Sequence, residues 1–181
     1  MDIAQAKRKE NIAEYILYLW QIEDLLRALQ FSPEAIYSQF VAPRNLDEQS
    51  QNVLLMWYMD IAALLQEEEK QSSGHLNHTL HLIADMHNLH LQLMQLPMGA
   101  QYRTVVARLE PYLPTLRTIF GKNISDTELC FRALYAAMLY RIKGGGEKVI
   151  TDTIEYISPV IATLTAMYHK VERGEIDLFK E

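Results

Sequence analysis

Cysteine, glycine and proline are scarce in this 181-residue chain, which has one Cys, seven Gly and six Pro. With Cys130 alone no intramolecular disulfide can form, so we expect a reducing, cytoplasmic location. The few turn-forming residues disfavour strand-rich folds. The longest nearly apolar run, residues 53–65, is interrupted by Asp60 and is too short to span a bilayer. No apolar segment follows the charged start at residues 1–10, so the sequence predicts neither a signal peptide nor a membrane partner.

Basic residues are also fewer than acidic ones: the chain has 17 Lys and Arg and 23 Asp and Glu, which gives a formal net charge of -6. This balance argues against nucleic acid as a partner, because phosphate contacts need clustered Lys and Arg. The charge is uneven: residues 46–96 hold seven acids and one base, and residues 97–150 hold eight bases and four acids. Oppositely charged helical pairs that pack together, or that meet across a dimer, would explain this asymmetry. A basic patch for an anionic ligand is the less favoured explanation.

What the chain has in plenty is helix-forming residues, and 49% of the sequence is hydrophobic. Apolar residues recur at helical spacing, and no alternating stretch is long enough for a strand. We expect an all-α fold, a single-domain bundle of six or seven mostly antiparallel helices over residues 1–174, with a loose C-terminal tail at 175–181. The predicted helices span about 2–29, 33–41, 45–70, 75–95, 101–121, 125–143 and 147–174.

Capping residues mark several of these helix ends. Ser32 before Pro33 is an N-cap followed by a proline at the first helical position. Asn45 with Glu48, and Ser125 with Glu128, resemble capping boxes. The prolines at 111 and 114 predict a break within the fifth helix.

A histidine-rich helix is the first candidate site, because five of the six histidines fall within residues 75–90. His78, His81 and Asp85 share one face and lie three or four residues apart, so they could offer a divalent metal site. That face looks solvated, and metal sites usually draw ligands from separate elements. We therefore favour no metal site here.

A polar core is the second candidate. His87 and His90 point toward the apolar side of the same helix, and Glu23 and Asp60 lie among apolar residues on other helices. A buried polar group needs a partner, so we expect at least one of the two acids to pair with one of these histidines or with an arginine. The four residues form either a closed structural pair or a candidate polar pocket with shifted pKa values.

The constellations of known helical enzymes are missing. A di-iron bundle needs Glu-x-x-His on two helices, and the chain has no such motif and no His-x-x-x-His. The three glycines at 144–146 lack the spacing of a phosphate-binding loop and read as a flexible turn. Cys130 lies on an apolar helix side, as an inert thiol does. We therefore expect no cofactor and lean against an enzyme.

Three segments, residues 4–28, 89–94 and 128–142, resemble an uncharacterised bacterial domain-of-unknown-function family of about this length. The resemblance implies an all-helical cytoplasmic protein and implies no activity. The leading hypothesis is a non-enzymatic helical module that binds a protein partner or itself. The alternatives are a small-molecule-binding or enzymatic bundle with the polar pocket, and a divalent-metal-binding protein.

Overall fold

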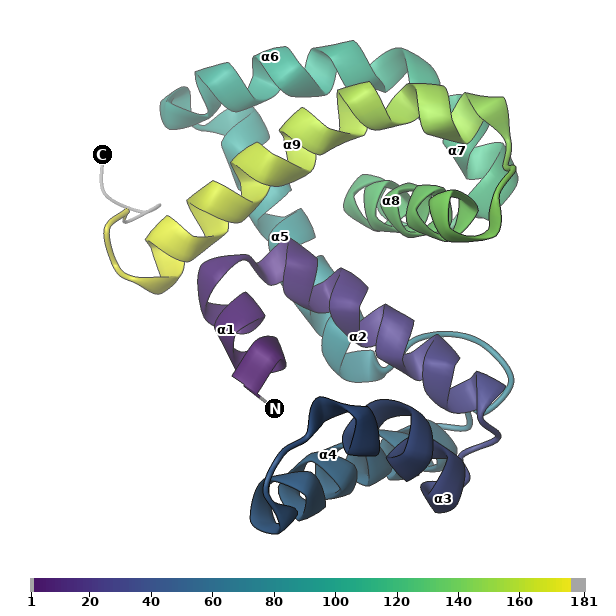
Figure 1. Ribbon diagram of the computed structural model, residues 1–181. Coiled ribbons are helices and arrows are strands. Elements are labelled where there is room, and N and C mark those ends of the chain that lie inside the picture. The colour runs from purple at the N-terminus through teal and green to yellow at the C-terminus, as the bar shows by residue number, and fades with distance from the viewer. Residues whose placement is uncertain (1, 177–181) are drawn as a thin grey trace. The chain divides into compact units, whose positions relative to one another are not determined.

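The computed structural model describes residues 2–176, and this part of the chain is helical with no strand. The all-α prediction is therefore confirmed (Figure 1). The helices are α1 (Asp2–Glu10), α2 (Ile12–Ala28), α3 (Pro33–Ile36), α4 (Glu48–Glu67), α5 (Asn77–Gln95), α6 (Ala100–Leu109), α7 (Leu113–Phe120), α8 (Asp126–Lys143) and α9 (Lys148–Glu172).

The structure has more helices than predicted because two of the predicted helices are divided. The first is interrupted at Asn11, between α1 and α2. Asn11 and Glu14 have the same spacing as the pairs at 45 and 48 and at 125 and 128, a helix-start signal that the prediction did not use. The fifth divides at the 3₁₀ turn Glu110–Tyr112, as the prolines predicted. One cap differs from the prediction: α4 is capped by Asp47, whose carboxylate accepts from the Ser50 amide, and not by Asn45.

Contacts divide the chain into two compact units, which are described separately. Unit 1 comprises Met1–Glu10 and Glu14–Leu80, and unit 2 comprises Asn11–Ala13 and His81–Glu181. The single-domain organisation over residues 1–174 stays a prediction. The predicted tail lies outside the described residues from residue 177 onward.

The core of unit 1 joins α2, α3 and α4. Leu26, Ile36 and Leu65 are fully buried there, and Tyr58 is nearly so. The segment before α5 is fastened to α2 by Trp20, whose ring stacks on His75 at a centroid distance of 3.7 Å. The Trp20 indole N–H also donates to the Thr79 hydroxyl at 3.0 Å. Different buried side chains of α2 therefore contact α4 and the start of α5.

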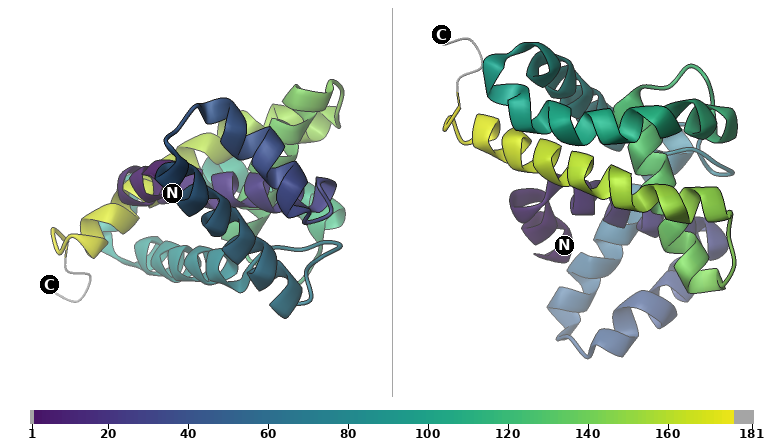
Figure 2. Two further views of the ribbon diagram at one scale, coloured as in Figure 1. Left: turned by 60° about the horizontal axis from the view of Figure 1, so that its bottom comes forward. Right: turned by 90° about the horizontal axis from the view of Figure 1, so that it is seen from above.

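Unit 2 is organised around the 25-residue helix α9. Both α6 and α8 pack on α9, and Figures 1 and 2 show α6 and α9 side by side. The buried residues Phe131 and Leu164 belong to this core. The turn into α6 requires Gly99, because a Cβ there would stand 1.8 Å from the Leu93 carbonyl oxygen.

The first turn of α2 is capped within unit 2 by a histidine. The Ile12 amide donates to His169 Nε2 at 3.0 Å, and Nδ1 of the same ring lies 3.3 Å from the Glu172 carboxylate. An acceptor at Nε2 requires the neutral ring with its proton on Nδ1, facing Glu172. This contact satisfies an amide that the helix itself leaves without a partner.

Candidate functional site

A face of α4 next to its core-facing side carries a stripe of side chains that line open cavities. Val53, Trp57, Asp60 and Leu64 follow at intervals of four, three and four residues, which places them on one helix face. Val53 and Leu64 are 44% and 43% exposed. The adjoining face of α4 is buried against the core, and Trp57 also packs against that core, with its ring stacked on Tyr18 at 6.5 Å.

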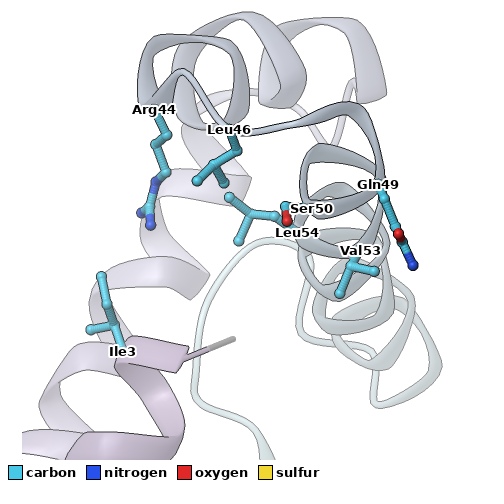
Figure 3. A pocket seen from close by; sticks show the side chains of 7 residues that line it. All are labelled: Ile3, Arg44, Leu46, Gln49, Ser50, Val53 and Leu54. Atoms are coloured by element: carbon cyan, nitrogen blue, oxygen red, sulfur yellow. The ribbon is translucent and has the colours of Figure 1, made fainter.

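A first cavity of about 390 Å³ lies at the N-terminal end of this stripe. Ile3 of α1 lies on one side of it, and Figure 3 shows Leu46 and Leu54 across the gap, with the Arg44 side chain extending toward the side of Ile3. Gln49, Ser50 and Val53 complete the lining. Ile3 and Leu46 are 44% and 39% exposed, so the cavity is open and partly apolar.

A second cavity of about 670 Å³ follows along the C-terminal half of α4. It is again bounded by α1 on one side and α4 on the other, with α2 and the start of α5 contributing. Its lining residues are Ala4, Gln5, Arg8, Lys9, Tyr15, Leu19, Trp57, Asp60, Ile61, Leu64, Leu76 and His78. We refer to the two cavities together as the α1–α4 groove, and all of its lining residues belong to unit 1.

Polar groups of the second cavity include a tyrosine–histidine pair. The Tyr15 hydroxyl and His78 Nε2 lie 3.1 Å apart, and the two rings meet edge to face at 5.9 Å. Partial burial raises the pKa of Tyr15, and the positive charge of Arg8 opposes this effect. The Tyr15 hydroxyl is therefore neutral at physiological pH.

The groove lining is basic although the whole chain is acidic. Arg44, Arg8 and Lys9 supply three positive charges, and Asp60 supplies one negative charge. The Arg44 guanidinium donates to the Phe40 carbonyl at 3.1 Å and to the Tyr58 hydroxyl at 3.3 Å. Both of these acceptors are neutral, so these bonds fix the guanidinium in place without cancelling its charge.

Glu23, the first member of the predicted polar pocket, is fully buried and has both carboxylate oxygens occupied. One oxygen accepts from the Leu76 amide at 3.1 Å, and the other lies 2.8 Å from His75 Nδ1. Arg27 lies 3.9 Å from the same carboxylate, which confirms the expected pairing with an arginine. The closer partner, His75, was missed because it lies in the loop before α5 and its position depends on the fold.

Of the other three members, Asp60 is exposed and lines the second cavity in unit 1, whereas His87 and His90 stack together in unit 2 at 5.3 Å. Nδ1 of His90 is 2.8 Å from the Tyr102 hydroxyl, and Nδ1 of His87 is 3.1 Å from the Thr127 hydroxyl. The cavity beside His90 measures about 20 Å³, room for about one water molecule. The four-residue pocket stays a prediction.

Burial governs the protonation of this unit 2 cluster. It lowers the pKa of His87 and of His90, and for His90 the neighbouring His87 lowers it further while Asp126 opposes the shift. Burial also raises the pKa of Tyr102, and it raises that of Cys130 to about 12. The imidazoles are therefore neutral near pH 7, and Cys130 is a protonated, buried thiol with no nucleophilic character.

The candidate metal ligands His78, His81 and Asp85 are all exposed on α5. His78 contacts Tyr15, as described above. Within residues 2–176, no group of three or more His, Cys, Asp or Glu side chains is arranged to hold a metal ion.

Most of the groove was not predicted from the sequence. The spacing of Val53, Trp57 and Leu64 was a usable signal, because it widens the apolar surface of α4 beyond the face that is buried. No local signal indicates that α1 would lie opposite this stripe, since α1 is a polar helix with Lys7, Arg8 and Lys9 in its last turn.

Fold and site together define an all-helical protein with an open apolar groove. Residues 1–175 match the family described as Domain of unknown function (DUF4924), and the chain belongs to this family. The match confirms the resemblance to a domain-of-unknown-function family. Neither a curated protein nor a solved structure matches the chain significantly. In the part of the chain that the structure describes, none of the helices has the length and apolar character needed to cross a membrane.

Proposed function

We propose that this chain is a non-enzymatic helical protein-interaction module, and that the α1–α4 groove is its binding surface. The observation that carries the proposal is the exposed apolar stripe on α4, which forms the floor of two open cavities. The cytoplasmic location and bacterial origin expected from the sequence belong to the same proposal. The partner is another protein or a second copy of this chain.

The distribution of exposed apolar side chains supports this placement. Among the described residues, six of the ten large apolar side chains with high exposure belong to unit 1: Ile3, Tyr37, Leu46, Val53, Met56 and Leu64. Three of these six line the first cavity, and Leu64 lines the second. Single exposed apolar residues are ordinary, but apolar residues gathered along a concave surface indicate an interaction site.

A small-molecule site is the second candidate, because the second cavity of about 670 Å³ has a size typical of ligand pockets. Trp57 and Leu64 would contact the apolar part of such a ligand. The polar cluster in unit 2 gives this alternative no support, since its cavity is too small for a ligand. Protein binding is favoured because the apolar surface continues beyond the second cavity into the first.

Photo-crosslinking in cells that naturally express the protein tests the proposal. A photoreactive phenylalanine analogue replaces Val53 or Leu64 in the groove, and the control replaces Ile142, which is 64% exposed on α8. We expect the same protein adduct from both groove positions and not from the control. An adduct of twice the chain mass would identify a second copy as the partner. Absence of an adduct at both groove positions, or equal labelling at the control, would refute the proposal.

A further inference from the structure

We propose that the occupant of the α1–α4 groove is an amphipathic helix of a partner protein, with acidic residues flanking its apolar stripe. This inference rests on the proposed function and specifies the chemistry of the partner. It follows from the length of the groove, the spacing of its apolar side chains and the charge of its lining.

The groove has the dimensions of a helix-binding surface. Its floor runs along α4 from Gln49 to Leu64, which corresponds to roughly 22 Å at 1.5 Å per residue. A docked helix of about four turns would cover this length. The two cavities lie one after the other along this floor and have α1 as their shared wall, so one continuous element can occupy both.

The apolar contacts are spaced for another helix. Val53, Trp57 and Leu64 present apolar surface along one side of α4, and Ile3 presents it from α1. Apolar residues of a partner helix at i, i+4, i+7 and i+11 would pack against this stripe, as amphipathic helices do in hydrophobic grooves. Trp57 is the expected anchor, because a large aromatic side chain beside a cavity commonly carries much of the binding energy.

The charge of the lining selects the flanks of the partner helix. Arg44 stands at the first cavity, and Arg8 and Lys9 stand at the second. Among the side chains that the structure describes, Asp60 is the only acid in either lining. Acidic residues beside the apolar stripe of a partner would face these cations, whereas basic residues would be repelled by them. Because the whole chain is acidic, this basic lining is a local feature of the groove.

Two synthetic peptides measure this preference directly. Each peptide has about 16 residues and carries leucine at i, i+4, i+7 and i+11. The positions beside this leucine stripe are glutamate in one peptide and lysine in the other, and all remaining positions are alanine. Binding to the full chain is followed by fluorescence anisotropy. We expect the glutamate peptide to bind at least about tenfold more tightly than the lysine peptide, since several charge contacts reverse sign together. Added salt should narrow the difference, because these charges are exposed.

Variants of the groove locate the binding. The double variant R8E/K9E should abolish or invert the preference between the peptides, and R8Q/K9Q should reduce it. Lys122→Glu, an exposed substitution in unit 2, should leave the preference unchanged. Leu64→Asp should weaken binding of both peptides by about tenfold or more through loss of apolar contact. Circular dichroism of each variant checks that the helices are intact.

The outcomes separate this inference from the proposed function. If both peptides bind equally and Leu64→Asp weakens both, the groove binds helices but the acidic preference is wrong. If neither peptide binds while Val53 and Leu64 crosslink to a protein, the proposed function stands and the inferred helix chemistry is overturned. Dodecanoate, a fatty-acid anion, serves as a small-molecule probe in the same binding assay. If it binds in the second cavity and neither peptide binds, the site belongs to a small amphiphile and the inference is likewise overturned.

Discussion

Unit 1 and unit 2 differ in how completely the apolar faces of their helices are covered. In unit 2, α9 lies against both α6 and α8, and the cavity beside His90 is about 20 Å³. In unit 1, α4 buries one face against α2 and α3 but leaves Val53 and Leu64 open toward α1. Cavities of about 390 and 670 Å³ remain there. Unit 2 also has open cavities of about 240 and 190 Å³, and both are smaller than the two cavities of unit 1. The comparison indicates that unit 1 retains more surface for a partner than unit 2.

The physical origin of this difference lies in the covering helices. α9 offers 25 residues with a continuous apolar face, including Ile157, Ile161 and Leu164. α1 offers nine residues, and Lys7, Arg8 and Lys9 fill its last turn. A short polar helix cannot bury a long apolar stripe, so the stripe on α4 stays partly exposed.

The largest predicted effect compares one leucine in each unit. Leu164→Ala removes a fully buried side chain of unit 2 and should lower the free energy of unfolding by about 3 kcal/mol. Leu64→Ala removes a side chain that is 43% exposed, and its cost should be about 0.5 kcal/mol or less. Urea unfolding measures both, and hydrogen exchange assigns each loss to its unit. Equal costs would show that the groove residues are as well packed as the core of unit 2.

The second prediction concerns the buried carboxylate of unit 1. Glu23→Ala removes the carboxylate that accepts from the Leu76 amide and lies beside His75. We expect a loss of about 2 kcal/mol, because the buried Leu76 amide loses its acceptor. Asp24→Ala is the control, because Asp24 is 44% exposed in its pair with Arg27, and it should cost under about 1 kcal/mol. Faster hydrogen exchange in the loop before α5 should accompany only the first substitution.

The third prediction compares matched helix caps. Ser125 caps the 18-residue helix α8 in unit 2, and Ser32 caps the four-residue helix α3 in unit 1. Their hydroxyls accept from Glu128 and Ala35 amides at 3.1 and 3.3 Å. Ser125→Ala should cost about 1 kcal/mol and Ser32→Ala about 0.5 kcal/mol in urea unfolding. A larger cost at Ser32 would show that the short helix α3 contributes more to stability than the 18-residue helix α8.

The smallest predicted effect is a pH dependence confined to unit 2. Burial holds the pKa of His90 below its ordinary value of 6.5. The unfolded chain therefore binds a proton more readily than the folded one, and stability should fall as pH drops through about 6.5. His90→Gln should flatten this dependence. Hydrogen exchange of α5 and α6 across that pH range would measure the dependence of stability on pH. If this dependence is unchanged in the variant, it is due to other groups, of which His87 is the nearest.

Local signals predicted most of the helical architecture. The prolines at 111 and 114 correctly placed the break after α6, and Ser125 correctly marked the start of α8. In the predicted capping box at α8, the Glu128 side chain bonds to Arg132. The cap of α4 moved from Asn45 to Asp47, because both residues favour caps and only the backbone conformation selects one.

The candidate site was predicted far less well. At least one of Glu23 and Asp60 was expected to pair in the core, since a buried acid must be satisfied. Glu23 does so, whereas Asp60 is exposed. The Glu23 partner His75 and the stacking ring of Trp20 are separated from each other by more than fifty residues of sequence. Such contacts depend on tertiary packing, which residue spacing within one helix does not contain.

The sequence by itself determined the all-helical character, most helix boundaries and the presence of a buried acid, because these depend on propensity, capping and periodicity over a few residues. Only the tertiary structure decided that α1 lies opposite the Val53–Leu64 stripe. It also decided that His87 and His90 bond to Thr127 and Tyr102. Both outcomes depend on which helices pack against one another, and that packing is a property of the whole unit.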